Sequence, residues 1–212
     1  MRYTLASALG QISDGLTASY ATLPADTYLQ HDRCFRFRAF GEATVKGRSF
    51  LWDDEPGSFF QSENVNGYAG GVERRFAPLP EAGRAFAEAL VNSAATRALV
   101  AEEEFRIGCH QIRITADDET VGLPAPEGFH QDGFDLIAVA CIGTTNVSGG
   151  ISLVRDRDSE EVIVERVMAP GEVLFLADRE VVHYVSPVTP KIPGETAHRD
   201  VFVTTFALGG EH

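Results

Sequence analysis

The chain has 212 residues, of which 44% are hydrophobic. This length is enough for a substantial core, and we expect one domain over residues 1–212. The formal net charge of -13 at pH 7 repels phosphate backbones and anionic lipid headgroups, so nucleic acid and membrane partners are not expected. No stretch approaches the roughly 20 apolar residues that span a bilayer. We therefore expect a cytoplasmic protein, with its oligomeric state left open.

The three cysteines favour a reducing compartment. Cys34, Cys109 and Cys141 are odd in number and lack the CxxC spacing of many zinc sites. Two of them lie in apolar runs, where cysteine packs as a small core residue. Neither a disulfide framework nor a cysteine-based zinc site is predicted.

The first part of the chain, residues 1–104, is predicted to be helical and mixed. Apolar residues near the N-terminus recur at helical spacing and predict a helix there, namely Leu5, Leu9, Ile12 and Leu16. The alanine-rich run Leu79–Ala101 has Pro80 at its start and predicts a second helix. Between the two, aromatic residues in 34–40 and 48–52 indicate strands.

The second part, residues 105–212, is predicted to form a β-rich core. Short alternating or β-branched runs are separated by turn signals such as Gly149-Gly150. The predicted strands are Phe105–Thr115, Phe134–Ile142, Ile151–Val154, Val162–Val167, Glu172–Leu176, Val181–Val185 and Val201–Phe206. Short strands at this spacing are typical of a sandwich or a jelly-roll barrel. We therefore expect a mainly β, jelly-roll or cupin-like fold with flanking helices.

Two side chains able to bind a metal stand just before one predicted strand. His130 and Asp132 are two residues apart, so on an extended backbone they point to the same side while Gln131 points away. A His-x-Asp pair is frequent by chance, and a strand histidine is usually structural. The pair alone is therefore weak evidence for a metal site.

His183 is the candidate for a third ligand. It interrupts the apolar run Val181–Val185 in a later predicted strand. Two histidines and one carboxylate leave coordination positions open on one side of the metal, as in non-haem Fe(II) oxygenases. Zinc favours sulfur ligands or a third histidine, so Fe(II) is the predicted metal and His130, Asp132 and His183 the predicted catalytic centre.

Arg199 is the candidate for binding an anionic cosubstrate. It precedes the last predicted strand, where Val201, Val203 and Thr205 share its face. An arginine facing an apolar interior needs an anionic partner, and its planar fork suits a carboxylate. We propose the distal carboxylate of 2-oxoglutarate as this partner, and Thr205, on the same face of the strand, is a further candidate for binding the cosubstrate. The alternative is an ion pair between strands.

Polar residues upstream give candidates for the rest of the pocket. Gln111 and Arg113 alternate with apolar neighbours, and a polar face at a barrel mouth would meet small anions. Arg113 is predicted to bind the substrate carboxylate or the C1 end of the cosubstrate, with Gln111 beside it. A solvent-facing edge strand is an equal alternative. The other histidines, His31, His110, His198 and His212, have no paired carboxylate at useful spacing and are expected to be structural or exposed.

Several stretches taken together resemble the 2-oxoglutarate/Fe(II) dioxygenases related to bacterial L-isoleucine 4-hydroxylase. They are Pro126–Gly133, Asn146–Gly150, His183–Pro187 and Arg199-Asp200, within a likeness that covers roughly 105–206. The resemblance implies a double-stranded β-helix, Fe(II) bound by the three residues above, and 2-oxoglutarate anchored by Arg199. Related enzymes hydroxylate free aliphatic L-amino acids, and some oxidise the sulfur of methionine.

The chain departs from this family just before Asn146. Thr144 and Thr145 stand where the family has a basic residue, which bears on the identity of the substrate. Thr145 and Asn146 are therefore candidate substrate-binding residues, although Asn146 with Gly149 and Gly150 is more typical of a tight turn.

The predicted function is hydroxylation of a small molecule, a free L-amino acid or a close derivative. The reaction would use Fe(II), 2-oxoglutarate and O2 and release succinate and CO2. Two alternatives are a non-catalytic, cupin-like protein that binds a metal or a small molecule, and a zinc hydrolase on the same barrel.

Overall fold

The computed structural model describes residues 1–7, 12–29, 34–54, 71 and 73–209. The strands are β1 (Tyr3–Ser7), β2 (Arg36–Lys46), β3 (Ser49–Trp52), β4 (Ala77–Pro78), β5 (Glu104–Ala116), β6 (Leu136–Thr145), β7 (Val147–Gly149), β8 (Ile151–Asp156), β9 (Val162–Val167), β10 (Glu172–Leu176), β11 (Val181–Val185), β12 (Val188–Pro190) and β13 (Ala197–Ala207). The helices are α1 (Asp14–Ser19), the 3₁₀-helix η1 (Tyr20–Thr22), α2 (Glu81–Val91) and α3 (Ala94–Leu99).

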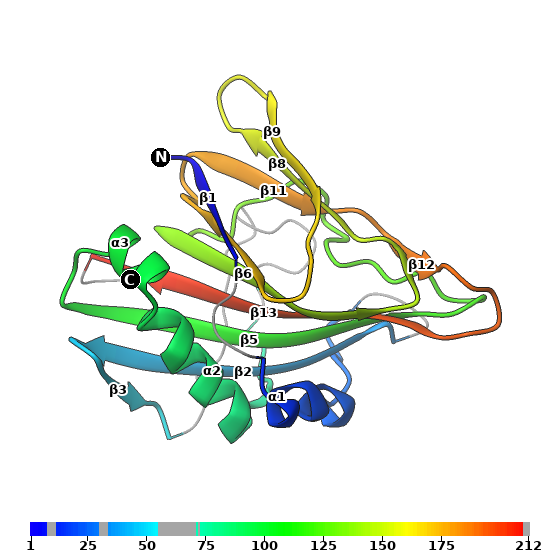
Figure 1. Ribbon diagram of the computed structural model, residues 1–212, viewed down its shortest axis with the longest axis horizontal. Coiled ribbons are helices and arrows are strands. Elements are labelled where there is room, and N and C mark those ends of the chain that lie inside the picture. Colours follow the sequence, from blue (N-terminus) through cyan, green and yellow to red (C-terminus); the bar gives the residue numbers. More distant parts are fainter. Residues whose placement is uncertain (8–11, 30–33, 55–70, 72, 210–212) are drawn as a thin grey trace.

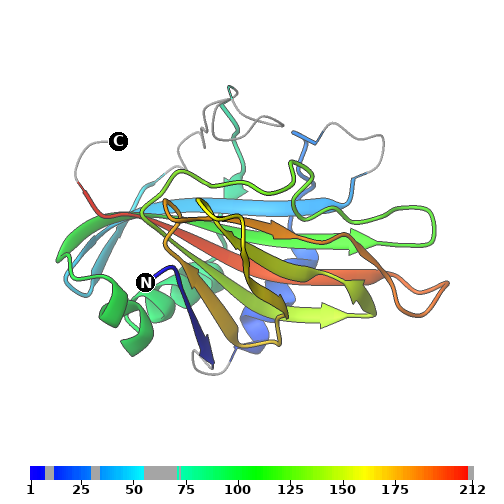
Figure 2. The ribbon, with the colours of Figure 1, turned by 90° about the horizontal axis from the view of Figure 1, so that it is seen from above.

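A large sheet and a small sheet organise the molecule (Figure 1). The large sheet has the strand order β1-β10-β6-β13-β5-β2-β3, with β4 beside β2. The small sheet has the order β11-β8-β9, and β7 pairs with β12 in a two-stranded ribbon. Seen from above, the helices lie on one side of the large sheet, and β8, β9 and β11 lie on the other (Figure 2).

Two apolar clusters fill the spaces on either side of the large sheet. One joins the helices to the sheet and includes Leu16, Leu90 and Phe202, all 1% exposed or less. The other lies between the two sheets and includes Ile137 and Val154. The large sheet is therefore buried on both faces, and alternate residues of its strands point to different layers.

The sequence predicted most of these strands but not the start of the chain. Leu5 lies in strand β1, which pairs with β10 through the register Leu5↔Leu174, whereas Leu16 lies in α1. Leu9 is outside the described residues. A strand at the edge of a sheet is stabilised by a partner far along the chain, and local spacing does not reveal that partner. The helix predicted from Leu5 onward is therefore wrong over β1.

The helix predicted over 79–101 is divided into α2 and α3. The break is at Asn92 and Ser93, where the Ser93 hydroxyl accepts a hydrogen bond from the Thr96 backbone N–H and begins α3. The boundary expected near residue 104 does not separate the sheet either. Strands β1, β2 and β3 precede it and belong to the same sheet as β5 and β13.

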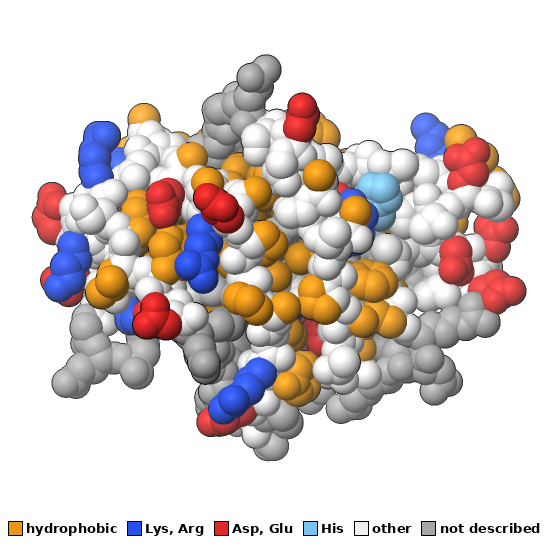
Figure 3. All heavy atoms as spheres, turned by 90° about the horizontal axis from the view of Figure 1, so that it is seen from below, with side chains coloured by type: hydrophobic (Ala, Val, Ile, Leu, Met, Phe, Trp, Pro, Cys, Tyr) orange, Lys and Arg blue, Asp and Glu red, His pale blue; other side chains and the backbone are white. Residues whose placement is uncertain are grey.

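The described helices are all too short or too polar to cross a membrane. On the face seen in Figure 3, the described acidic and basic side chains are interspersed around a central apolar area. On that face the negative net charge is therefore not gathered into one patch.

Candidate active site

A backbone bridge brings the two predicted metal-binding segments together. His130 pairs with His183 through two hydrogen bonds, from His130 N to His183 O (3.0 Å) and from His183 N to His130 O (2.9 Å). His183 is held in register by β11, where it lies opposite Val154 of β8. The loop that carries His130 and Asp132 is thus fixed against a strand of the small sheet.

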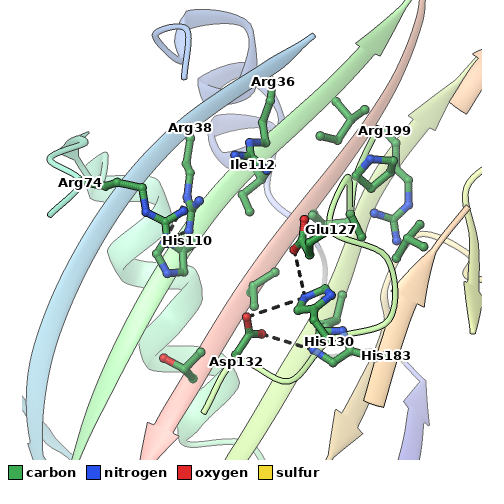
Figure 4. Close-up of a pocket in the computed structure, with 18 residues that line it drawn as sticks. Arg36, Arg38, Arg74, His110, Ile112, Glu127, His130, Asp132, His183 and Arg199 are labelled. Carbon is green, nitrogen blue, oxygen red and sulfur yellow. Dashed lines mark hydrogen bonds and ion pairs between the residues drawn. The ribbon is translucent and has the colours of Figure 1, made fainter. Parts of the chain in front are cut away.

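The three candidate ligands converge on one point of the pocket (Figure 4). One ligand atom from each of His130, Asp132 and His183 lies within 4.8 Å of the others. The Nε2 of His183 is 3.4 Å from Asp132 Oδ2, and the Nε2 of His130 is 3.9 Å from Asp132 Oδ1. Gln131 points away and donates a hydrogen bond to the Asp178 backbone oxygen. These distances form a His/Asp/His metal site.

The hydrogen bonding of the two imidazoles fits a metal at this point. His130 Nδ1 is 2.9 Å from the Gly128 carbonyl oxygen. A carbonyl only accepts, so Nδ1 donates this bond, and Nε2 faces Glu127 Oε1 at 3.4 Å and Asp132 Oδ1 at 3.9 Å. Within the described residues, the buried Nε2 of His183 makes no hydrogen bond. A buried nitrogen of this kind calls for a partner, and a cation supplies one.

The charges of the triad also suit a cation. Burial by itself raises the pKa of Asp132, but the adjacent His183 and His130 outweigh this and hold the pKa below its ordinary value. Burial lowers the pKa of His183, whereas Asp132 raises it, and the net direction is upward. The site thus combines a carboxylate whose charged form is favoured with two adjacent imidazoles, which are ligand types that bind a cation.

Asp178 holds the loop that carries Asp132, a role that the sequence did not reveal. Its carboxylate is fully buried and accepts hydrogen bonds from the backbone N–H groups of Asp132 (3.1 Å), Gly133 (2.6 Å) and Phe134 (3.0 Å). Gly133 has φ +91°, a conformation that glycine adopts without strain and that directs its N–H towards Asp178. Burial and the nearby Asp132 raise the pKa of Asp178.

The triad opens into a cavity between the two sheets. Its volume is about 130 Å³, measured as the space that the centre of a water molecule can occupy. The lining residues are Arg36, Arg38, Arg74, His110, Ile112, Ile114, Pro124, Ala125, Glu127, His130, Asp132, Val139, His183, Val185, Arg199, Val201, Val203 and Thr205. The floor comes from four adjacent strands of the large sheet, β2, β5, β13 and β6.

Arg199 lies in this cavity, on the face of β13 that the sequence predicted. It is 3% exposed and shares the cavity with Val201, Val203 and Thr205. Within the described residues it forms no ion pair, and its buried Nη2 makes no hydrogen bond. Burial lowers its pKa. A buried guanidinium without a carboxylate partner fits an anionic ligand such as 2-oxoglutarate.

Thr205 lines the cavity further along the same strand. It is 2% exposed, and its hydroxyl lies 3.2 Å from the Gly108 carbonyl oxygen, to which it donates. The hydroxyl oxygen keeps its capacity to accept a hydrogen bond.

Gln111 and Arg113 lie on the opposite face of β5, outside the cavity. Gln111 is fully buried and donates to the Ser19 hydroxyl of α1 at 2.7 Å. Arg113 forms a two-point ion pair with Asp200, with both N···O distances at 2.7 Å. The pocket roles predicted for Gln111 and Arg113 therefore do not match their positions. Both faces of β5 are buried, so alternation alone does not tell which face meets the cavity.

Thr145 and Asn146 also lie outside the cavity. Thr145 is exposed near the end of β6. Asn146 has φ +54°, and its side-chain amide hydrogen-bonds the backbone of Ile192 and Glu195. Asn146 is thus a turn residue that holds the 191–195 loop. Thr144 and Thr145 are both exposed, and neither lines the cavity.

His110 and three arginines of the cavity were missed. His110 was expected to be structural or exposed, yet it is 2% exposed and lines the cavity with Arg36, Arg38 and Arg74. The alternation Arg36-Phe37-Arg38 within the predicted strand 34–40 was a usable signal, because two charges on one face of a strand rarely both meet a core. His31 and His212 are outside the described residues.

Comparison with protein families decides the assignment. The model described as "2OG-Fe dioxygenase" matches residues 17–205. The chain belongs to this family. Its members use Fe(II), 2-oxoglutarate and O2, and the His/Asp/His site described above supplies ligands of the required type. The chain is therefore a 2-oxoglutarate- and Fe(II)-dependent oxygenase.

Solved structures share the fold. A bsmA homolog (Mpe_A2762) from Methylobium petroleophilum PM1 is 29% identical, with 94% of this chain and 82% of that chain covered and a TM-score of 0.75. IDO from Bacillus thuringiensis is 18% identical, with 97% and 90% covered and a TM-score of 0.73. The Fe(II)/(alpha)ketoglutarate-dependent dioxygenase TqaL is 16% identical, with 97% and 82% covered and a TM-score of 0.64.

These structures confirm the prediction of a mainly β jelly-roll fold with flanking helices. Curated protein sequences give no match to this chain.

Proposed function

We propose that this oxygenase hydroxylates a small free L-amino acid or a close derivative. The supporting observation is the cavity itself, in which a His/Asp/His site and a buried arginine without an ion pair among the described residues share about 130 Å³. Such a space takes small ligands rather than a folded polypeptide.

The residues have separate roles in this proposal. His130, Asp132 and His183 bind Fe(II), and Asp178 keeps the loop of Asp132 in place. Arg199 binds the distal carboxylate of 2-oxoglutarate, and Thr205 lines the cavity further along β13, with its hydroxyl donating to the Gly108 carbonyl oxygen. When bound, Fe(II) with 2-oxoglutarate and O2 supplies the oxidation that inserts one oxygen atom into a C–H bond and yields succinate and CO2.

The apolar side chains in the wall support the choice of an unactivated C–H bond as the target. Ile112, Val139 and Val203 lie between the charged groups of the cavity. They exclude water from the space next to the metal site and offer contact surface to an aliphatic chain.

A succinate assay tests the proposal. Purified protein is incubated with Fe(II), ascorbate, 2-oxoglutarate and a panel of L-amino acids, and succinate and a product heavier by one oxygen atom are measured. We expect both to appear together for at least one amino acid. If no succinate forms above the metal-free control, the oxygenase proposal for these substrates fails and a cupin-like binding protein is favoured. Activity that persists without O2 and 2-oxoglutarate would instead favour a zinc hydrolase.

Arg199→Gln tests the cosubstrate assignment in the same assay. Loss of a charge-assisted two-point contact is expected to raise the KM for 2-oxoglutarate about 10- to 100-fold. An unchanged KM would contradict the role given to Arg199.

A further inference from the structure

A second carboxylate lies beside the triad without being one of its three ligands. Glu127 lines the cavity, and its side chain is 14% exposed. Its Oε1 is 3.4 Å from the Nε2 of His130, the nitrogen that also faces Asp132. Figure 4 shows the Glu127 side chain beside His130, with its carboxylate turned towards the triad. The metal end of the cavity therefore has two carboxylates, and the His/Asp/His site uses only Asp132.

A proline turn fixes the backbone of Glu127. The Gly128 N–H donates to the Ala125 carbonyl oxygen at 3.1 Å, which closes a turn with Pro126 and Glu127 at its two central positions. Proline at the first central position presets the backbone of such a turn. The Gly128 carbonyl oxygen accepts in its turn from Nδ1 of His130 at 2.9 Å. Glu127 is thus held against the ligand ring, and little backbone freedom is lost when a ligand binds it.

A metal at the triad takes from Glu127 its only printed contact in the cavity. Among the described residues, the carboxylate forms one ion pair, with Nε2 of His130. A metal occupies this nitrogen, and Nδ1 already donates to Gly128, so the ring has no hydrogen to offer Glu127. A largely buried carboxylate requires a donor. The metal-loaded site therefore leaves Glu127 in need of a new partner.

The metal itself is not the partner that this chemistry favours. His130, Asp132 and His183 already supply two imidazoles and one carboxylate. The remaining coordination positions are needed for 2-oxoglutarate and O2, and a further protein ligand would block one of them. The partner of Glu127 is therefore expected to arrive with the substrate.

We propose that Glu127 binds the ammonium group of the primary substrate. An ammonium only donates hydrogen bonds and carries the charge opposite to that of a carboxylate. The unbonded Nη2 of the buried Arg199 indicates independently that this cavity takes a charged ligand. Ile112, Val139 and Val203 line the same cavity and offer contact to aliphatic carbon. The preferred substrate thus has a protonated amine on an aliphatic chain. This inference rests on the proposed function and names the residue that distinguishes an amino acid from other small acids.

Paired substrates isolate the contribution of the ammonium group. Each active amino acid is compared with the 2-hydroxy acid of the same carbon skeleton, in which a neutral hydroxyl replaces the ammonium. We expect the wild-type enzyme to prefer the amino acid by at least about tenfold in kcat/KM, and Glu127→Gln to lose most of this preference, because glutamine carries no charge. The KM for 2-oxoglutarate should change less than about twofold. A preference in Glu127→Gln equal to that of the wild type would overturn the proposal while leaving the proposed function intact.

Binding measurements without turnover separate substrate recognition from metal binding. The affinities for Fe(II), and for the amino acid in the presence of Fe(II) and 2-oxoglutarate, are measured by anaerobic titration calorimetry. Glu127→Gln should leave the Kd for Fe(II) within about twofold and raise the Kd for the amino acid about 10- to 100-fold. If the Kd for Fe(II) rises about tenfold and that for the amino acid does not change, Glu127 serves the metal site and our assignment is wrong.

Two further variants control for charge and for folding. Glu127→Asp keeps the charge on a shorter side chain and should retain more of the preference than Glu127→Gln. Glu104→Gln removes a carboxylate that is 61% exposed and paired with Lys46 outside the cavity, and it should change neither the preference nor either KM. If Glu127→Gln does not fold, the wild-type comparison decides, since equal kcat/KM for the amino acid and the 2-hydroxy acid would contradict the proposal.

The two proposals fail in different ways. If amines without a carboxylate are oxidised instead of amino acids, and Glu127→Gln raises their KM, the assignment of Glu127 stands and the amino-acid proposal falls. If no compound with an amino group yields succinate above the metal-free control, both proposals are overturned.

Discussion

The metal-binding side of the cavity and the wall formed by β2 and β5 are built in different ways. On the metal side, His130 and Asp132 are two residues apart, and a single backbone bridge adds His183. On the wall, Arg38 and His110 meet although 72 residues separate them in the sequence. The metal side is a local motif closed by one long-range contact, whereas the wall is made only by strand pairing.

This difference bears on how each side tolerates change. The metal side relies on the loop that Asp178 holds through three backbone N–H groups. The wall relies on the register of β2 with β5, in which Arg38 lies opposite Ile112 and Phe40 opposite His110. Substitutions on the metal side should alter metal binding, and substitutions in the wall should alter ligand binding while the metal site stays intact.

The largest effect is expected at the triad itself. His130→Ala or Asp132→Ala removes a ligand of the proposed Fe(II) site and should lower turnover by a factor of about 1000 or more, because the chemistry depends on the metal. Iron content after gel filtration and succinate formation measure the two consequences. Gln131→Ala is the matched control, since this side chain points away from the site. If Asp132→Ala keeps its iron and its turnover, the assignment of the metal site to this position is wrong.

Asp178→Asn should weaken metal binding without removing a ligand. The amide replaces one oxygen by an N–H donor, which faces backbone N–H groups that need an acceptor. We expect the Kd for Fe(II) to rise about 10- to 100-fold, with turnover recovered at excess iron. Asp135→Asn serves as control in the same loop, because its carboxylate bonds Leu208 and Arg179 instead. An unchanged Kd would show that the loop does not depend on Asp178.

Arg113→Gln should affect stability rather than catalysis. It breaks the two-point pair with Asp200, which is 3% exposed at its side chain, and leaves that carboxylate without its partner. The expected loss in the free energy of unfolding is about 2–3 kcal/mol, with both KM values unchanged. Urea unfolding and steady-state kinetics are the measurements. A rise in the substrate KM without a loss of stability would instead indicate that Arg113 contacts the substrate, as the sequence analysis predicted.

Thr145→Val should have the smallest effect. The side chain is exposed and lies outside the cavity. We expect the free energy of unfolding to change by less than about 0.5 kcal/mol and the substrate KM by less than about twofold. A larger change in KM would mean that the threonine pair at the end of β6 contacts the substrate.

The sequence by itself determined the fold class and the components of the metal side. Alternating strands with turn signals predicted the β-rich second half, and period-two geometry placed His130 and Asp132 on one side of an extended segment. The same geometry placed Val201, Val203 and Thr205 with Arg199. These inferences need only a few neighbouring residues and the regular geometry of an extended chain.

Only the tertiary structure decided which face of β5 meets the cavity. Helices cover the Gln111 face and the cavity occupies the His110 face, so both faces are buried and the hydrophobic pattern does not distinguish them. The positions of Asp178 and Arg74 have the same explanation. Asp178 contacts the loop of Asp132, and Arg74 lines the same cavity. Both residues are far from that loop in the sequence, so local residue spacing does not reveal that they lie near it.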